Sequence, residues 1–284
     1  MRPVHRYFLI TVAVTWSCVL AAGLISGPGG NAQAAIAVQR WPLLILGAFA
    51  PSLVALAMTY RDEGRAGTRA LLARLLEWRV GARWFAFALL YMAAIKLGVA
   101  LVLRLATGSW PPFGHYAWPS FLVTALVATI FGGPLGEELG WRGYALPRLA
   151  EHFGYGRASI IVGVVWALWH LPIFFIPGLD QSGQSLFTYI PQVMALSVAM
   201  TWLYVHTRGS LLLAVLMHSA INQSKDIVTS IVHGAVNPLL PSRSPIAWVT
   251  ITLLWIAAAL MLARLSREAG VAREAEPLTP AFES

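Results

Sequence analysis

Two adjacent glutamates, Glu137 and Glu138, follow a long apolar stretch, and Arg142 comes four residues after the second. Residues 118–135 contain no Asp, Glu, Lys or Arg, and ionisable groups beside such a stretch are costly to bury. Because residues at i and i+4 share one face of an α-helix, we expect Glu138 to pair with Arg142. Glu137 points about 100° away and has Trp141 as its i+4 neighbour. We therefore predict a structural role for Glu138 and Arg142 and a chemical role for Glu137.

A simpler interpretation remains for each of these polar residues. The two glutamates could cap a helix end or contact water at the membrane surface. His170, in "VVWALWHLPIFF", could be a hydrogen-bonded core histidine. His218 and Asn222, at i,i+4 in "LMHSAINQS", could form hydrogen bonds between helices. However, their positions in their apolar stretches give compatible depths, so we expect His170, His218 and Asn222 to face Glu137 in one cavity open to the cytoplasm.

The composition indicates a membrane protein. Of 284 residues, 58% are hydrophobic and 11% charged, whereas soluble domains average about 25% charged. We predict an all-α, polytopic transmembrane helix bundle in a single domain over residues 1–266, followed by a polar C-terminal tail at 267–284. A span needs about 20 apolar residues, which gives about eight candidates: 7–25, 41–60, 84–106, 119–136, 158–177, 187–206, 210–232 and 246–264. The first could be a cleaved signal peptide, but its apolar length favours a retained helix.

Arginines alternate between the expected loops. Segment 61–83 carries six arginines and three acidic residues, whereas segment 107–118 carries no charged residue. By the positive-inside rule, both termini and the basic loops are cytoplasmic. These loops account for the net charge of +8, so we expect no nucleic-acid partner. We expect an integral protein of the lipid bilayer, in the cytoplasmic (inner) membrane of a bacterium. Lys96 lies within a predicted span, and the sequence indicates no partner for it.

Three motifs, in order, resemble a known family. "EELGWRGYALPRL" resembles the Glu-Glu-x-x-x-Arg motif of the type II CAAX prenyl endopeptidase and bacteriocin-processing family (CPBP, also called Abi). "WALWH" resembles its Phe-x-x-x-His motif, with Trp166 in place of Phe, and "HSAIN" matches its His-x-x-x-Asn motif. The resemblance covers roughly residues 119–225 and implies an intramembrane protease. We expect the change from Phe to Trp to alter packing more than chemistry.

The resemblance also implies roles for single residues. Glu137 would activate a water molecule with His170 as its partner, and His218 and Asn222 would stabilise the oxyanion. The Glu138–Arg142 pair would hold the site. The family has been described both as metalloproteases and as metal-independent glutamate proteases. No cofactor is required by the sequence; in the metal alternative His170, His218 and Glu137 bind zinc, a two-His, one-Glu set with precedent.

The sequence therefore predicts an intramembrane endopeptidase of the CAAX-processing type. Its partner would be a peptide or membrane-protein substrate, membrane-associated or prenylated-like, that reaches the cavity from the cytoplasm or the bilayer. One alternative is a transporter or proton relay that uses the same glutamate and histidines as a titratable chain. Another is a non-catalytic bacteriocin-immunity protein. Neither the cleavage site nor the oligomeric state is predicted.

Overall fold

The computed structural model of the chain describes residues 2–25, 38–114, 129, 133–179, 181–224, 227–229 and 237–275. All regular structure within these ranges is helical, which confirms the predicted all-α class. Six helical stretches are long and apolar enough to cross a membrane, so the polytopic bundle is also confirmed: Arg2–Leu24, Trp41–Leu76, Ala82–Thr107, Pro134–Phe175, Leu186–His206 and Pro245–Glu268.

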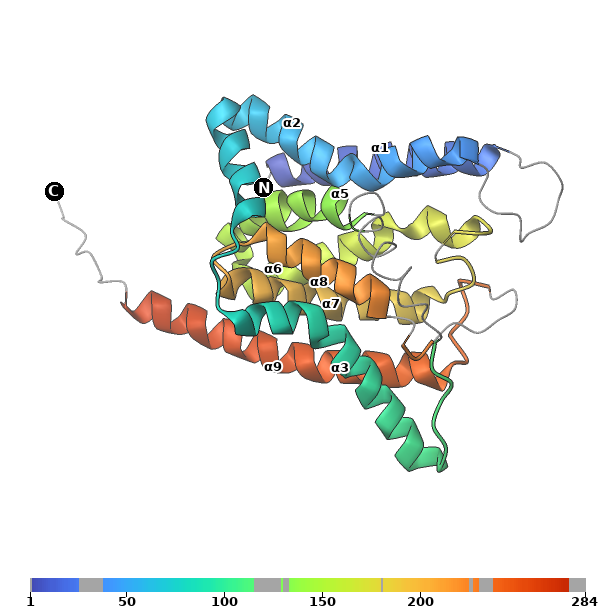
Figure 1. The fold of residues 1–284 in the computed structure, drawn as a ribbon. Helices are drawn as coiled ribbons and strands as arrows, with labels where there is room; N and C mark the ends of the chain where they lie inside the picture. The colour runs from blue at the N-terminus through green and yellow to red at the C-terminus, as the bar shows by residue number, and fades with distance from the viewer. Residues whose placement is uncertain are drawn as a thin grey trace.

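The count of about eight spans stays a prediction. Most of the predicted fourth span, 119–136, lies outside the described residues, and the seventh appears as a short apolar helix. The helices are drawn in Figure 1: α1 (Arg2–Leu24), α2 (Trp41–Ala73), α3 (Ala82–Thr107), α5 (Pro134–Glu138), α6 (Leu146–Trp169), α7 (Leu186–His206), α8 (Leu211–Ser224) and α9 (Pro245–Ala275). Helix α9 thus continues beyond residue 267, where the tail was expected.

The first motif lies inside a helical stretch, although the predicted spans 119–136 and 158–177 left residues 137–157 as a loop between them. Helix α5 continues through a π-helical segment, η3 (Leu139–Ala145), into α6. Hydropathy suggested a loop because this stretch carries charged side chains, but Glu137, Glu138 and Arg142 are buried in protein, and only later ones such as Glu151 and Arg157 are exposed. The chain reverses within α6 at Gly154, whose φ of 72° favours glycine.

A hydrogen bond demonstrates this reversal. The Trp166 side chain contacts Glu137, 29 residues earlier, although a straight helix would hold them about 43 Å apart. Glu137 and His170 are nearly the same number of residues from Gly154 on the two arms. The hairpin therefore brings both residues to one level, which the sequence alone allowed but did not require.

Two glycines let α2 lie close against the first motif. A Cβ on Gly136 would come 2.8 Å from the carbonyl oxygen of Ala48. A Cβ on Gly140 would come 2.5 Å from the carbonyl oxygen of Pro51. Small residues four apart commonly allow such close approach between membrane helices. Tyr7 of α1, also fully buried, closes the other flank of the motif.

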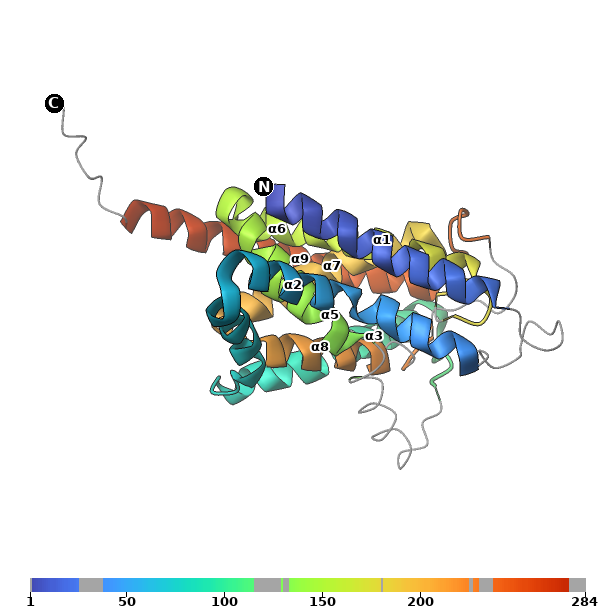
Figure 2. The same ribbon diagram turned by 90° about the horizontal axis from the view of Figure 1, so that it is seen from above.

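Beyond Gly64, where φ is 66°, the chain of α2 changes direction. The following residues, through 76, run across the ends of neighbouring helices (Figures 1 and 2). Arg74 Nη1 donates to the Tyr204 hydroxyl at 2.7 Å, and Leu71 is buried beside Gly143. This transverse segment therefore covers the end of the bundle next to the first motif.

Lys96, for which the sequence indicated no partner, is buried in α3. Its Nζ donates to the carbonyl oxygen of Val228, 3.1 Å away. This bond links α3 to the chain just beyond α8. We assign Lys96 to the support of this region, because it does not line the cavity described below.

Candidate active site

Glu137 lies in α5, and only 4% of its surface is exposed. Its Oε2 accepts a hydrogen bond from Trp166 Nε1 at 2.6 Å and a longer one from Trp141 Nε1 at 3.4 Å. Gly133, with φ 121°, leaves room for the other oxygen, because a Cβ there would lie 2.5 Å from Glu137 Oε1. Within the described part of the chain, Glu137 forms no ion pair. Its carboxylate is therefore oriented by neutral donors.

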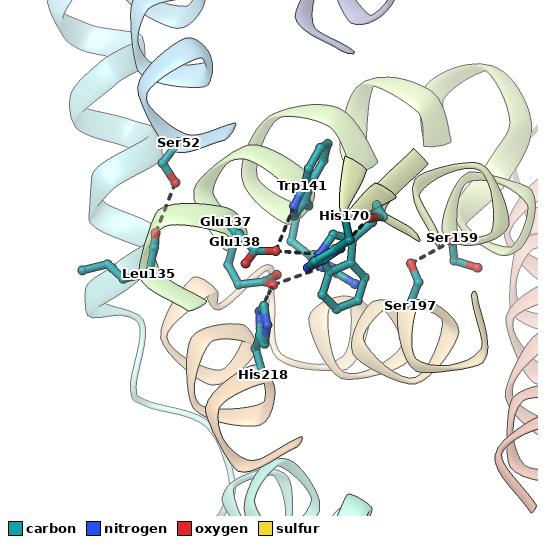
Figure 3. A network of polar contacts seen from close by, with 11 residues as sticks. Ser52, Leu135, Glu137, Glu138, Trp141, Ser159, His170, Ser197 and His218 are labelled. Atoms are coloured by element: carbon teal, nitrogen blue, oxygen red, sulfur yellow. Dashed lines mark hydrogen bonds and ion pairs between the residues drawn. The ribbon is translucent and has the colours of Figure 1, made fainter. Parts of the chain in front are cut away.

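Glu138 is held differently. Its Oε1 lies 3.1 Å from Arg142 Nη1 and 2.7 Å from His218 Nδ1, and the side chains of Glu138 and Arg142 are fully buried (Figure 3). The i,i+4 pair predicted from the sequence therefore forms. The contact with His218 was missed, because 80 residues separate the two positions and no local spacing indicates it. His218 is thus anchored by Glu138 through one nitrogen, and its Nε2 is left for other contacts.

His170 follows the last residue of α6. Its Nδ1 lies 2.8 Å from the carbonyl oxygen of Trp166. Because a carbonyl oxygen only accepts, Nδ1 must carry the hydrogen, and the neutral ring then has its lone pair on Nε2. The ring packs edge-on against Trp169, with 4.6 Å between ring centres. These contacts fix both the tautomer and the orientation of the imidazole.

Trp166 contacts Glu137, His218 and Arg142. Beside its bond to Glu137, its ring lies 5.2 Å from the His218 ring and 4.5 Å from the guanidinium carbon of Arg142. Such a cation–π contact stabilises a buried cation in addition to its ion pair with Glu138. Phenylalanine has no N–H to donate, so Trp in place of Phe adds a polar contact with Glu137 to any change in packing.

One cavity of about 280 Å³ is bordered by Glu137, His170, His218 and Asn222. The structure thus brings together the four side chains that the sequence proposed for catalysis, from α5, the end of α6, and α8. Further lining residues come from α1, α2, α7 and the α6–α7 connection: Thr15, Trp41, Leu44, Ile45, Tyr189 and Gln181.

The metal alternative requires three donors around one point. In the ranges that the structure describes, no three His, Cys, Asp or Glu side chains gather closely enough to hold a metal ion. The Nδ1–H groups of both histidines are held by oxygen acceptors, as they are in many metal-binding histidines, so the mismatch with zinc rests on the separation of the three side chains and not on their hydrogen bonds. The residues in this arrangement do not fit a bound zinc ion, so no chemical step below is derived through one.

The buried Glu138–Arg142 pair leads to a prediction about stability. The change Glu138→Gln leaves the guanidinium of Arg142 buried without its counter-charge, and loss of one partner of a buried pair costs about 3–5 kcal/mol. We expect a clearly lower midpoint in detergent unfolding followed by circular dichroism. Asp62→Asn, which breaks an exposed ion pair with Arg61, is the matched control and should leave the midpoint unchanged. Equal midpoints for the two variants would contradict the structural role of Glu138.

Comparisons with known proteins support the family resemblance that the three motifs indicate. Residues 118–224 match the family model described as type II CAAX prenyl endopeptidase Rce1-like. CAAX prenyl protease 2 of Methanococcus maripaludis is 30% identical over 149 residues, which are 49% of this chain and 54% of that protein. The chain thus matches about half the length of this relative. Because the matched family segment contains all three motifs, the resemblance to the type II CAAX prenyl endopeptidases is confirmed for it.

Proposed function

We propose that the chain is an intramembrane endopeptidase that hydrolyses a peptide bond with a water molecule activated by Glu137. The observation that carries this proposal is the convergence of Glu137, His170, His218 and Asn222 on one cavity. The name of the archaeal relative, CAAX prenyl protease 2, supports proteolysis over transport. The substrate class that we propose is a membrane-associated peptide segment.

Glu137 is the general base of this mechanism. The indole donors orient its carboxylate, which takes a proton from water as the water oxygen attacks the scissile carbonyl carbon. The lone pair of His170 Nε2 accepts the second water hydrogen and aligns the nucleophile. The π electrons of the carbonyl move to its oxygen. When the C–N bond then breaks, protonated Glu137 gives its proton to the departing amine.

His218 and Asn222 stabilise the oxyanion. Because His218 Nδ1 donates to Glu138, a hydrogen on Nε2 requires the imidazolium form of this ring. The charges of Arg142, Glu138, imidazolium and Glu137 then sum to zero, which suits a buried cluster. The amide N–H of Asn222 supplies a second donor. Donors fixed before the reaction lower the barrier without having to reorient as charge develops.

The decisive test is Glu137→Gln, which keeps the shape of the side chain and removes the base. We expect cleavage to fall by at least about 100-fold, since positioned acid–base groups contribute about 100- to 10,000-fold. Mass spectrometry of membrane peptides from cells with wild-type or variant protein would identify the product. Glu151→Gln, at an exposed position of α6, is the control. Unchanged processing by Glu137→Gln would refute the proposal, and full complementation by a variant without cleavage would favour the immunity protein.

Trp166→Phe tests the donor to Glu137. Phenylalanine keeps the ring between the imidazoles but removes the N–H, and a hydrogen bond to a charged group contributes about 1.5–3 kcal/mol. We expect kcat on the identified peptide to fall about tenfold or more, with little change in KM. Trp255→Phe removes an indole bond to the carbonyl oxygen of Pro191, away from the cavity, and should leave kcat nearly unchanged. A similar loss in both variants would show that packing, not the bond to Glu137, is responsible.

Metal removal distinguishes the proposed glutamate mechanism from a zinc-dependent one. With the donors arranged as described, we expect cleavage of the same peptide to persist after dialysis against a chelator, with metal content measured by elemental analysis. Activity that disappears with the metal and returns on addition of zinc would contradict the glutamate mechanism. In that case His170, His218 and Glu137 would have to move together around the ion.

A further inference from the structure

The two ends of the bundle differ strongly in charge. Arginines gather at the end where α1 and α3 begin and where α2 and α7 end (Figure 1). Contacts among distant residues define this end, including Arg148 with Glu63 and Arg208 with Glu77. Among the described residues, the opposite end carries Arg40, Arg104 and Arg243. The positive-inside rule therefore assigns the arginine-rich end to the cytoplasm.

The cavity extends from Glu137 toward the opposite end. Its lining on α1 comes from the second half of the helix, including Val19, and its lining on α2 comes from the first turns, 41–48. On α7 it comes from the first turns, including Tyr189, and the remainder lies in the α6–α7 connection, including Gln181. All of these positions are remote from the arginine-rich end.

The arginine-rich side of Glu137 is filled with protein. Trp141, Arg142 and Tyr144, the next residues of the motif toward that end, have no exposed surface. Leu71 of the transverse segment covers them, close enough that a Cβ on Gly143 would lie 2.7 Å from its Cδ1. The described side chains therefore separate the cavity from the cytoplasmic end.

The far border of the cavity is apolar and partly exposed. Trp41 has 49% of its surface exposed, and Leu44 and Ile45 are half-buried on the same helix end. Gln181 supplies a polar group on the other side. Tryptophan at a helix end suits the membrane–water interface, where its ring contacts lipid and its N–H contacts water. This border therefore fits a peptide with an apolar residue that approaches along the bilayer surface.

We propose that the substrate reaches Glu137 from the side of the membrane away from the cytoplasm. The peptide segment lies at the extracytoplasmic surface and places an apolar side chain against Trp41, Leu44 and Ile45. This inference rests on the proposed function for its substrate, and it reverses the expectation of a cavity open to the cytoplasm. Substrates would then be exported peptides or extracytoplasmic segments of membrane proteins.

Cysteine accessibility tests the direction of access. In a Cys18→Ala background, which removes the single cysteine, Ala48→Cys reports on the cavity beside Gly136. Ala70→Cys, exposed on the transverse segment, is the matched control. The probe is a membrane-impermeant trimethylammonium methanethiosulfonate, applied to spheroplasts and to inverted membrane vesicles of a bacterial host. We expect Ala48→Cys to react at least tenfold faster in spheroplasts and Ala70→Cys at least tenfold faster in inverted vesicles.

A second cysteine position provides an independent measurement in case one variant folds poorly. Gln181→Cys, at the border of the cavity, should react like Ala48→Cys. Faster reaction of these two variants in inverted vesicles, or no reaction of either in both preparations, would overturn the proposal. Reaction of Ala70→Cys from outside would overturn the assigned orientation. Labelling needs no proteolysis, so its outcome is independent of whether Glu137→Gln abolishes cleavage.

Discussion

Two neighbouring carboxylates are buried in this bundle, and the rest of the site depends on how each of them is stabilised. Glu138 faces a buried guanidinium and an imidazole, and these contacts offset the cost of removing its charge from water. Glu137 points to another face of the same helix, where two indole N–H groups hold it. One turn of helix thus provides a carboxylate with charged partners and a second one, oriented by neutral donors, that we propose as the general base.

The hairpin at Gly154 makes this arrangement possible. It places the second arm, with Trp166 and His170, beside the start of the first, where Glu137 lies. The close contact of α2 through Gly136 and Gly140 excludes lipid from the first arm. Because the charged groups are surrounded by protein, they can lie deep in the bundle without contacting hydrocarbon. The close packing that Gly136 and Gly140 allow therefore keeps the charged groups of the site surrounded by protein.

Local features of this site could be predicted from the sequence, and long-range ones could not. The pairing of Glu138 with Arg142 follows from helical spacing alone, as does the shared face of His218 and Asn222. Residues 137–157 were expected to form a loop, because hydropathy does not distinguish charges in water from charges paired inside a protein. The bond between Glu138 and His218 depends on how α5 and α8 pack, which no spacing along the chain encodes.

The indole of Trp166 illustrates why the type of donor matters as much as its position. A cation in contact with Glu137 would form a stronger, charge-assisted bond, and it would hold the carboxylate in its ionised form throughout the reaction. A neutral N–H fixes the orientation of the carboxylate and still allows it to accept a proton. The guanidinium of Arg142 instead lies over the face of the same ring and pairs with Glu138. Trp166 thus keeps the positive charge close to the site while it gives Glu137 a neutral partner.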